Sequence, residues 1–360
     1  MSISKSVDIA HDYLIQMGGA ERVVACLLKS FPSSSLYTSF TDYPSLWNDF
    51  HHSRIRNSFM QVIPKSTFFC KLCFPIYPLA FWLHKIPKTS KNVIVSSSTF
   101  SKFIRTSRST KKILYCHNPV RFLYDKEYVT SEIRNRWLRS VARLFFPPLR
   151  LLDKYAMRSY DVIVANSNNV KQRISNSYHL ESIVVYPPVD TAKFCVSTVS
   201  SEYYLVLSRL VAYKRIDIVV EAFRILGREL HIVGDGPDFE RLVSLSTPNV
   251  KFYGKLKEHE IFSQYSMCRA FLFPGEEDFG ITPLEAQASG KPVIAYGKGG
   301  ALETILEDET GLFFYEQTPS AVVEAVLKSD AIAWDPYKIR SHAEKFDVAG
   351  FIEKIESLLD

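Results

Sequence analysis

Short apolar runs alternate with amphipathic stretches along this chain, and the alternation continues through both halves. The apolar or β-branched runs lie at residues 7–14, 93–98, 112–117, 162–167 and 183–186, and again at 203–208, 229–233, 249–253, 270–273, 292–296 and 312–315. Runs of this length that are separated by helical stretches are typical of strands in a parallel sheet. The pattern therefore predicts an α/β protein with two successive, doubly wound parallel sheets.

The length of the chain agrees with two sheets in two domains. The 360 residues exceed the usual size of one domain, about 50–250 residues. Pro187 and Pro188 follow the last run of the first half. We expect a first domain at 1–188, a linker at 189–202 and a second domain at 203–345. The amphipathic end of the chain, 346–360, is predicted to form a helix that packs across the domain junction.

The stretch 273–306 concentrates candidate chemistry. After an acidic turn, Thr282 is a suitable N-cap, and Glu285 falls three residues later, so the pair predicts a capping box. Gly290 follows as a helix end. The capping box by itself gives Glu285 a purely structural task.

A second strand, loop and helix follow directly, with a glycine-rich loop at 297–300 and Glu303 on the helix. The loops of two such neighbouring units face the crevice beyond the carboxyl ends of the strands. Helix N-termini at that edge can hold a phosphate group.

Two cations stand at the start of the second domain. Arg209 and Lys214 follow a strand and lie five residues apart, a combination that suits a diphosphate because a guanidinium binds in a fork and an ammonium adds a point charge. Charged pairs at helix starts are also common without any ligand. Gly234 and Gly236 follow the next strand, but the third glycine of a dinucleotide-binding motif is missing, which argues against a nicotinamide site.

The first domain offers two further candidates. Gly18 and Gly19 precede a helix that carries Glu21, and such glycines let the backbone approach an anion; a flexible turn explains the pair equally well. His117 ends a strand. A lone histidine in that place is more often part of the core.

The charge is distributed unevenly. Residues 1–188 hold 26 Lys and Arg against 11 Asp and Glu, a balance of +15, whereas residues 189–360 hold 18 against 27, a balance of −9. From His51 to Tyr124 there are 13 basic residues and no acidic one. A positive domain of this kind implies an anionic partner, either membrane lipid or nucleic acid.

Two basic, aromatic stretches, 64–88 and 131–158, could lie in a membrane interface. The alternative is that their aromatic residues belong to the core. The longest uncharged run, 72–83, has 12 residues and two prolines, too short for a bilayer, which needs about 20. Pro147 and Pro148 are expected to break the second stretch.

The cysteines indicate no disulfide framework or metal site. Six are scattered along a chain that opens without a signal-peptide pattern, so we expect reduced thiols in the cytoplasm. Cys70 and Cys73 form a lone CxxC without a second pair or a nearby histidine. No D-x-D motif occurs either.

Taken together, these residues resemble family 4 of the retaining GT-B glycosyltransferases, which have two facing Rossmann-like domains with a cleft between them. The specific part is the pair Glu277 and Glu285 with seven residues between them, followed by a glycine-rich loop. Corroborating motifs are the Gly18 loop with Glu21, His117-Asn118-Pro119, Tyr186-Pro187-Pro188-Val189-Asp190, the Arg209 and Lys214 pair, Gly234-Asp235-Gly236-Pro237 and the glycine loop before Glu303.

The resemblance implies roles for individual residues. Arg209 and Lys214 should hold the donor diphosphate in place of a metal ion, so neither a metal nor a resident cofactor is expected. Glu285 should bind the ribose hydroxyls. Glu277 should bind the donor sugar near the reacting carbon, and His117 should reach the same sugar from the first domain. Donor contacts are also expected from backbone groups at Gly18, Gly19, Gly280, Ile281 and Thr282.

The motifs around His117, Pro187 and Glu277 look most like bacterial mannosyltransferases of O-antigen and surface-polysaccharide synthesis. This implies a peripheral enzyme on the inner face of the plasma membrane. It would move mannose from GDP-mannose, with retention of configuration, to a polyprenyl-diphosphate-linked oligosaccharide, and it would have no nucleic-acid partner. Either a front-face reaction or a double displacement with Glu277 as nucleophile is compatible with the sequence. A UDP-sugar donor, a sugar-nucleotide 2-epimerase and a nucleic-acid- or lipid-binding protein are the alternatives.

Overall fold

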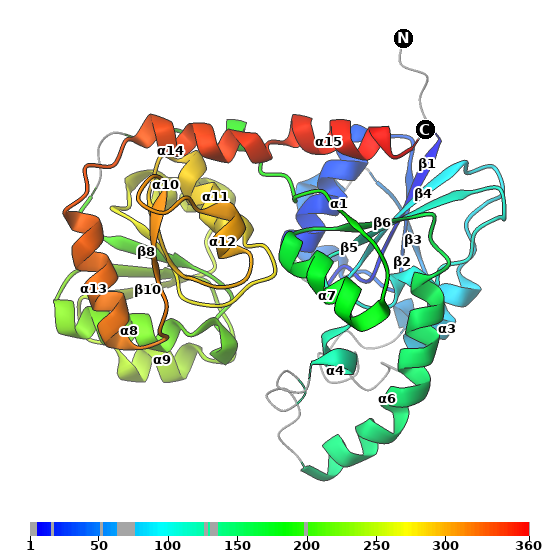
Figure 1. Ribbon diagram of the computed structural model, residues 1–360, viewed down its shortest axis with the longest axis horizontal. Coiled ribbons are helices and arrows are strands. Elements are labelled where there is room, and N and C mark those ends of the chain that lie inside the picture. Colours follow the sequence, from blue (N-terminus) through cyan, green and yellow to red (C-terminus); the bar gives the residue numbers. More distant parts are fainter. Residues whose placement is uncertain are drawn as a thin grey trace. The chain divides into compact units, whose positions relative to one another are not determined.

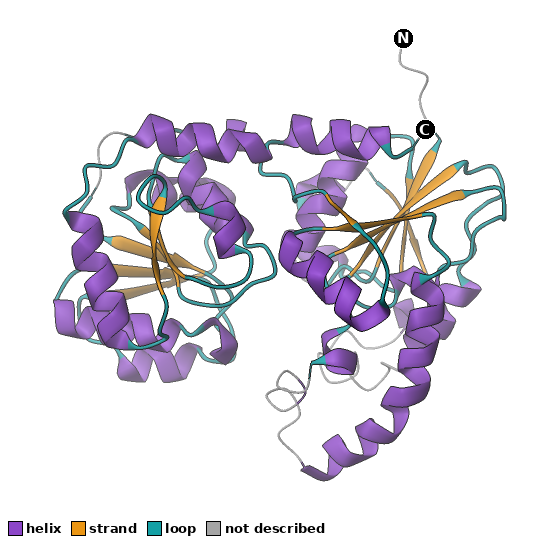
Figure 2. Ribbon diagram, in the orientation of Figure 1, coloured by secondary structure: helices purple, strands orange, loops and turns teal. Residues whose placement is uncertain are grey.

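The computed structural model describes residues 6–15, 18–50, 53–62, 76–125, 129, 136–197 and 201–359. The chain divides into two compact units, Met1–Tyr186 with Phe351–Asp360, and Pro187–Gly350. In each unit helices cover both faces of one sheet (Figures 1 and 2). Cys70 and Cys73 lie outside the described residues, as does the first part of the basic, aromatic stretch 64–88, which includes Lys65 and Lys71.

The described part of the first unit contains a parallel sheet in the order β3-β2-β1-β4-β5-β6-β7. Its strands are β1 (Val7–His11), β2 (Ser35–Thr38), β3 (Arg54–Asn57), β4 (Asn92–Ser97), β5 (Lys111–Cys116), β6 (Val162–Ala165) and β7 (Ile183–Val184). The central strands alternate between two cores: Val93 and Val95 of β4 face one cluster, and Ile94 faces the other. A central parallel strand is buried on both faces for this reason.

The helices in the described part of the first unit are α1 (Gly19–Ser30), α3 (Tyr77–Leu83), α4 (Arg121–Tyr124), α6 (Arg136–Met157), α7 (Asn168–Tyr178) and α15 (Val348–Ser357). One core packs against α1, and the C-terminal residues Phe351, Ile355 and Leu359 complete it. The other core includes residues of α3, α7 and the short turn η5 (Ser101–Phe103).

Strands β2 and β3 were not predicted. β2 has four residues, and β3 at the sheet edge reads Arg54-Ile55-Arg56-Asn57, so neither gives an apolar run. Pairing in the sheet supplies what the local sequence lacks: β2 pairs with β1, with Leu36 opposite Ile9, and β3 pairs with β2, with Ile55 opposite Leu36. Charged residues on an edge strand are common because they discourage pairing with other chains.

The expected break at Pro147 and Pro148 is wrong, because both prolines lie inside the continuous helix α6. A proline removes the hydrogen bond to the carbonyl four residues earlier, so the carbonyls of Arg143 and Leu144 lose their helical donors. Packing on neighbouring elements outweighs this cost in α6. Within the described residues, no helix is long and apolar enough to cross a membrane.

The second unit has a parallel sheet in the order β10-β9-β8-β11-β12-β13 over its described residues. The strands are β8 (Tyr204–Leu207), β9 (Leu230–Val233), β10 (Val250–Gly254), β11 (Phe271–Phe273), β12 (Val293–Tyr296) and β13 (Gly311–Phe314). Strand order reverses between β8 and β11, which is the switch point where open α/β sheets bind ligands.

Seven helices of the described second unit flank this sheet: α8 (Ile216–Leu226), α9 (Phe239–Leu245), α10 (Glu258–Met267), α11 (Ile281–Ala288), α12 (Ala301–Thr304), α13 (Pro319–Asp330) and α14 (Pro336–Ala343). A large apolar cluster joins α8, α9 and α13 to one face of the sheet. Helices α10, α11, α12 and α14 contact one another through α11.

The described residues of the predicted linker, 189–197 and 201–202, belong to the second unit. Val189 pairs with Asp347 in a parallel bridge. The guanidinium of Arg340 donates to the carbonyls of Phe194, at 2.6 Å, and Thr191, at 3.0 Å, and also to that of Ala288 in α11, at 2.7 Å. This segment is thereby fastened to the end of α11.

Candidate functional site

The loops that follow β8, β9, β11 and β12 form the candidate site of the second unit. These strands are parallel neighbours, so their carboxyl ends lie along one edge. All the second-unit residues that the sequence singles out lie on these loops or on the helices that begin there. The sheet thus gathers segments that are nearly 100 residues apart in the chain, such as Arg209 and Glu303.

Glycines allow two of these loops to touch. A Cβ on Gly234, where φ is 133°, would collide with the carbonyl oxygen of Ser208, and one on Gly236 would collide with that of Leu210. Backbone hydrogen bonds at 3.0 and 3.1 Å join Leu210 to Asp235 and to Asp238. Gly234 therefore packs the loop that carries Arg209, which is itself exposed.

Lys214 and Glu277 form an ion pair. Lys214 ends the turn η7 (Ala212–Lys214), which presses on Gly275, because a Cβ there would lie 3.0 Å from the Cα of Lys214. The two side chains are 15% and 23% exposed. The structure thus brings together the predicted diphosphate cation and the predicted sugar-binding carboxylate.

Arg215 and Gln317 support this arrangement and were not predicted. Arg215 has a left-handed backbone, with φ of 53°, and its guanidinium donates to the side-chain and backbone oxygens of Gln317 at 3.3 Å. Gln317 in turn donates to the carbonyl of Pro274 at 2.9 Å. The two residues therefore tie the Lys214 turn to the Glu277 loop. No spacing in the sequence links Arg215 to Gln317, 102 residues away.

The predicted capping box at Thr282 and Glu285 is wrong. Helix α11 begins at Ile281, and its N-cap is Gly280, which has φ of 86° and ψ of 90° and makes no side-chain cap. A side chain at Gly280 would also lie 2.9 Å from the ring of Phe273. The first backbone N–H groups of a helix have no partner inside it. Those of Ile281 and Thr282 therefore suit an anion at this N-terminus.

Glu285 lies in the second turn of α11 and is buried, with 1% of its surface exposed. The hydroxyl of Tyr265 in α10 donates to its Oε2 at 2.8 Å. Phe194 and Phe271 pack on the Tyr265 ring. The carboxylate is thus held by a neighbouring helix and does not cap its own.

The second strand–loop–helix unit pairs with the first. Glu277 and Gly299 form a parallel bridge, and the N–H of Gly300 donates to the carbonyl of Glu277 at 2.9 Å. A Cβ on Gly299 or Gly300 would strike this segment. The glycines therefore place the start of α12, with Glu303, against the Glu277 loop.

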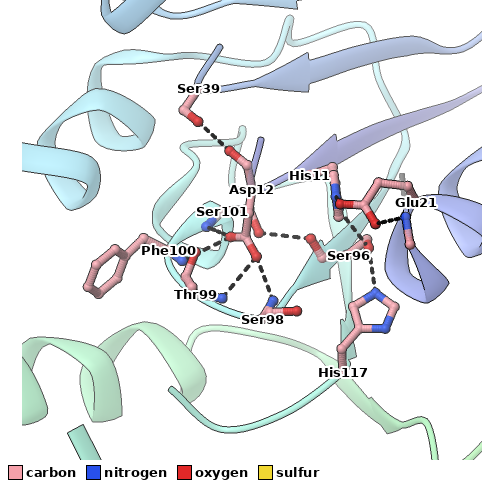
Figure 3. A network of polar contacts seen from close by, with 11 residues as sticks. His11, Asp12, Glu21, Ser39, Ser96, Ser98, Thr99, Phe100, Ser101 and His117 are labelled. Atoms are coloured by element: carbon pink, nitrogen blue, oxygen red, sulfur yellow. Dashed lines mark hydrogen bonds and ion pairs between the residues drawn. The ribbon is translucent and has the colours of Figure 1, made fainter. Parts of the chain in front are cut away.

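In the first unit, a chain of polar contacts joins the glycine loop to His117 (Figure 3). The N–H of Gly18 donates to Oε2 of Glu21 at 2.9 Å, and Oε1 of Glu21 lies 3.6 Å from Nε2 of His11. The Ser96 hydroxyl lies 3.0 Å from Nδ1 of His11 and 2.7 Å from Nε2 of His117. Glu21 is thus both the cap of α1 and the carboxylate partner of His11.

The two histidines of this chain have opposite electrostatic environments. Burial lowers the pKa of His117 to about 3, and the neighbouring His11 contributes to this shift. Burial also disfavours the charged form of His11, but Glu21 and Asp12 outweigh it and raise the pKa of His11 above its usual value. The positive charge is therefore favoured on His11, and His117 remains neutral.

Asp12 organises the turn after β4, and no sequence pattern predicted this role beyond its place after a strand. Its carboxylate accepts hydrogen bonds from the backbone N–H groups of Ser98, Thr99, Phe100 and Ser101 (Figure 3). The four distances are 2.6 to 2.9 Å. Burial opposes the charge, but the neighbouring His11 and these hydrogen bonds lower the pKa of Asp12. Among the described residues, no group of three or more His, Cys, Asp and Glu is arranged to hold a metal ion.

Comparison with known proteins places the second unit in a family. Residues 196–329 match the family described as Glycosyl transferases group 1. This segment includes every second-unit loop of the candidate site. The solved structure of Alr3699/HepE from Anabaena in complex with UDP is similar to this one, with a TM-score of 0.70 over 98% of this chain and 99% of that one at 15% identity. The expected fold class, GT-B with two Rossmann-like parallel sheets, is confirmed.

Curated relatives cover different shares of the chain. The GDP-mannose-dependent alpha-(1-6)-phosphatidylinositol monomannoside mannosyltransferase of Mycobacterium tuberculosis is 31% identical over 200 residues, 47% of this chain and 52% of that protein. Alpha-1,3/1,6-mannosyltransferase ALG2 of Dictyostelium discoideum is 23% identical over 82% of this chain and 83% of its own length. An uncharacterized glycosyltransferase of Methanocaldococcus jannaschii is 24% identical over 50% of this chain. The chain spans about half the length, 52%, of the archaeal and mycobacterial relatives.

Proposed function

Because residues 196–329 match the family described as Glycosyl transferases group 1, we propose that the chain is a retaining glycosyltransferase that moves mannose from GDP-mannose to a polyprenyl-diphosphate-linked oligosaccharide. One observation carries the proposal: the Lys214 and Glu277 ion pair lies at the strand ends that also begin α11. A cation, a carboxylate and a helix N-terminus at one edge suit a diphosphate that carries a sugar.

The roles proposed for the side chains follow from this arrangement. Arg209 and Lys214 hold the donor diphosphate and stabilise the charge that develops on it as the sugar leaves. Lys214 then exchanges its contact with Glu277 for the phosphate, which leaves the Glu277 carboxylate to bind the sugar. The carboxylate of Glu285 binds the ribose hydroxyls. His117 contributes to transfer as a neutral hydrogen-bonding group.

Two exchanges test the site. Lys214→Ala removes the cation and is expected to lower kcat by about 100-fold or more, the scale of one charge-stabilising group. Glu285→Gln keeps an oxygen for the Tyr265 hydroxyl but loses the charge, so the fold should persist while donor affinity falls. Lys255→Ala is the matched control, since its side chain is 83% exposed. Full transfer activity in both variants would refute the assignment.

Mannose as the donor sugar is supported by the names of the mycobacterial and Dictyostelium relatives. The UDP bound to the Anabaena protein makes UDP-sugars the competing donors. A thermal-shift panel of GDP-mannose, UDP-glucose, UDP-galactose and UDP-N-acetylglucosamine decides between them, with GDP-mannose expected to give the largest shift. Conversion of the nucleotide sugar without any acceptor would indicate a 2-epimerase instead.

Two adjoining cavities of the first unit support an amphiphilic acceptor. A cavity of 340 Å³ is lined mainly by apolar side chains, namely Phe122, Leu123, Val129, Phe146 and Pro147. A second cavity of 480 Å³ begins at Asn118 and includes Arg121 and Arg173, and both cavities include Asp125. Both volumes are typical of ligand sites. We propose that the cationic cavity takes the diphosphate and the apolar one takes the first isoprene units.

Farnesyl diphosphate is a suitable probe for these cavities. Arg173→Gln and Phe146→Ala should each weaken its binding by about tenfold, the scale of one charged hydrogen bond or one apolar contact. Lys171→Gln on α7 and Tyr155→Ala on α6 are matched controls from the same helices. Equal binding of farnesyl diphosphate by all four variants would count against an acceptor site here. So would inorganic diphosphate that binds the protein as tightly as farnesyl diphosphate does.

A peripheral position on an anionic membrane is the last part of the proposal. Leu79, Trp82 and Leu83 of α3 are each 50% or more exposed, and Leu151 and Tyr155 of α6 are 72% and 77% exposed. Exposed basic residues accompany them, namely Lys85, Lys88, Arg105 and Arg158. Exposed apolar side chains among cations suit the interface of an anionic bilayer.

A further inference from the structure

The Ser96 hydroxyl lies between two imidazole rings and has only one proton to donate. Its Oγ is 3.0 Å from Nδ1 of His11 and 2.7 Å from Nε2 of His117. Ser96, His11 and His117 are all buried, at 0%, 2% and 8% exposure. A hydroxyl in this position donates to one ring and accepts from the other, so the two rings cannot choose their tautomers independently.

Glu21 determines how His11 enters this chain. Nε2 of His11 faces Oε1 of Glu21 at 3.6 Å, and a bare ring nitrogen beside a carboxylate would be repelled. Nε2 of His11 therefore carries a proton whether the ring is neutral or charged. The variable proton of His11 is the one on Nδ1, which faces Ser96.

Two arrangements follow. When His11 is neutral, its Nδ1 accepts from the Ser96 hydroxyl, and Ser96 Oγ accepts from Nε2–H of His117. When His11 is charged, its Nδ1–H donates to Ser96 Oγ. The hydroxyl then donates to Nε2 of His117, and the His117 proton must lie on Nδ1.

We propose that His11 is a positioning residue whose protonation sets, through the Ser96 hydroxyl, which ring nitrogen of His117 carries its proton. The change balances. One proton binds Nδ1 of His117, the proton on Nε2 passes to Ser96 Oγ, and the former hydroxyl proton passes to Nδ1 of His11. The net uptake is one proton, and the positive charge rests on His11 beside Glu21 while His117 stays neutral.

The surrounding groups favour this distribution of charge. Among the described residues, the charges that act on His11 are those of Glu21 from α1 and of Asp12 from its own strand end, whose carboxylate binds the turn after β4. His117 lies beyond Ser96 at the end of β5. Tyr115 packs edge-on against the His117 ring at 5.1 Å. The two carboxylates raise the pKa of His11, whereas burial first and then the charge of His11 lower the pKa of His117.

Nitrogen NMR of the full chain, labelled with ¹⁵N-histidine, tests the proposal directly. His117 is expected to be a neutral Nε2–H tautomer at high pH and a neutral Nδ1–H tautomer below the pKa of His11. Ser96→Ala should abolish the change, and Ser96→Thr, which keeps the hydroxyl, should restore it. A single His117 tautomer at every pH, or the same change in Ser96→Ala, would overturn the proposal.

Glu21→Gln provides an independent check. It keeps an oxygen for the Gly18 N–H but removes the charge beside His11, so the pH of the tautomer change should fall by about one unit. An unchanged midpoint would contradict the role of Glu21.

An activity measurement extends the test to catalysis and rests on the proposed function. The kcat for transfer should show an inflection at the pH of the tautomer change, which Ser96→Ala removes without altering KM for the donor. Because the NMR result needs no transfer, absence of transfer would refute only the proposed function. Transfer whose pH profile is identical in Ser96→Ala would refute the coupling to catalysis.

Discussion

The two buried histidines of the first unit should contribute to the pH dependence of folding with opposite signs. The pKa of His117 is lowered to about 3, so between pH 3 and its usual value near 6.5 only the unfolded chain binds this proton. Stability therefore falls as the pH falls through that window. The pKa of His11 is raised, so its contribution is complete below pH 6.5 and is lost as the pH rises through the folded value.

We expect His117→Gln to flatten the acid limb of the stability profile and His11→Gln to flatten the decline above pH 6.5. Each group can change the free energy of unfolding by at most about 1.4 kcal/mol per pH unit. Urea unfolding between pH 4.5 and 9 measures both slopes. The pKa of Asp12 is lowered, so Asp12 changes the free energy of unfolding mainly at pH values below this range. Both variants retain Asp12. Identical profiles for the two variants would contradict the assignment.

At this scale the sequence predicted which residues gather but not their partners. The order of the strands brings Arg209, Lys214, Glu277 and Glu285 to one edge of a parallel sheet. The alternation of apolar runs with amphipathic stretches was sufficient to predict this grouping. The Thr282 cap failed because the chain enters α11 through Gly280, where a positive φ starts the helix two residues earlier than a cap at Thr282 would. Tyr265 as the partner of Glu285 depends on the packing of α10, which no local pattern encodes.

At the scale of elements, a buried ion pair anchors α6. Nζ of Lys102 in η5 lies 2.8 Å from Oδ1 of Asp153 in α6, and the two side chains are 1% and 0% exposed. The hydroxyls of Tyr178 in α7 and Tyr124 in α4 donate to the other oxygen of Asp153 at 2.7 and 3.1 Å. One carboxylate thereby joins four elements, of which α4, α6 and α7 line the proposed acceptor cavities.

Removing one partner of this pair should be costly. Asp153→Asn leaves a buried ammonium without its counter-charge, and we expect a loss of about 3–5 kcal/mol in the free energy of unfolding. The double exchange Lys102→Met with Asp153→Leu should recover most of that loss, because buried apolar pairs of similar size often replace ion pairs without penalty. Denaturant unfolding of both variants provides the measurement. Equal losses in the single and double variants would show that the pair does not act as a unit.

Some helices and strands could be predicted from sequence patterns, and others could not. The central strands have apolar runs because they are buried on both faces, and the sequence predicted them. β3 has two arginines in four residues and forms only because β2 lies beside it. Pro147 and Pro148 predict a break, yet α6 continues through them because tertiary contacts such as that of Asp153 outweigh the local preference.

At the scale of the whole molecule, the charge asymmetry predicts salt-dependent membrane binding. The chain should bind vesicles that contain phosphatidylglycerol more tightly than vesicles of phosphatidylcholine alone, and added salt should weaken the difference. Neutralising Lys85 and Lys88 should weaken binding by about fivefold for each charge, since one basic residue at such a surface contributes roughly 1 kcal/mol. Vesicle sedimentation measures this.

Trp82→Ser tests the apolar part of the same surface and should also weaken binding to the vesicles. Neutralising Lys328 and Lys338, which are 58% and 59% exposed in the second unit, is the matched control and should change little. If the control pair weakened binding as much as Lys85 and Lys88, attraction would depend on net charge and not on this surface.

The packing of the chain end has a consequence for synthesis on the ribosome. Phe351, Ile355 and Leu359 complete a core that begins with Val7 and Ile9. A nascent chain therefore cannot finish its first unit until residues 351–359 have been translated and have left the exit tunnel. The earliest translated unit is thus the last to close, and the segment at 187–350 has the opportunity to fold first.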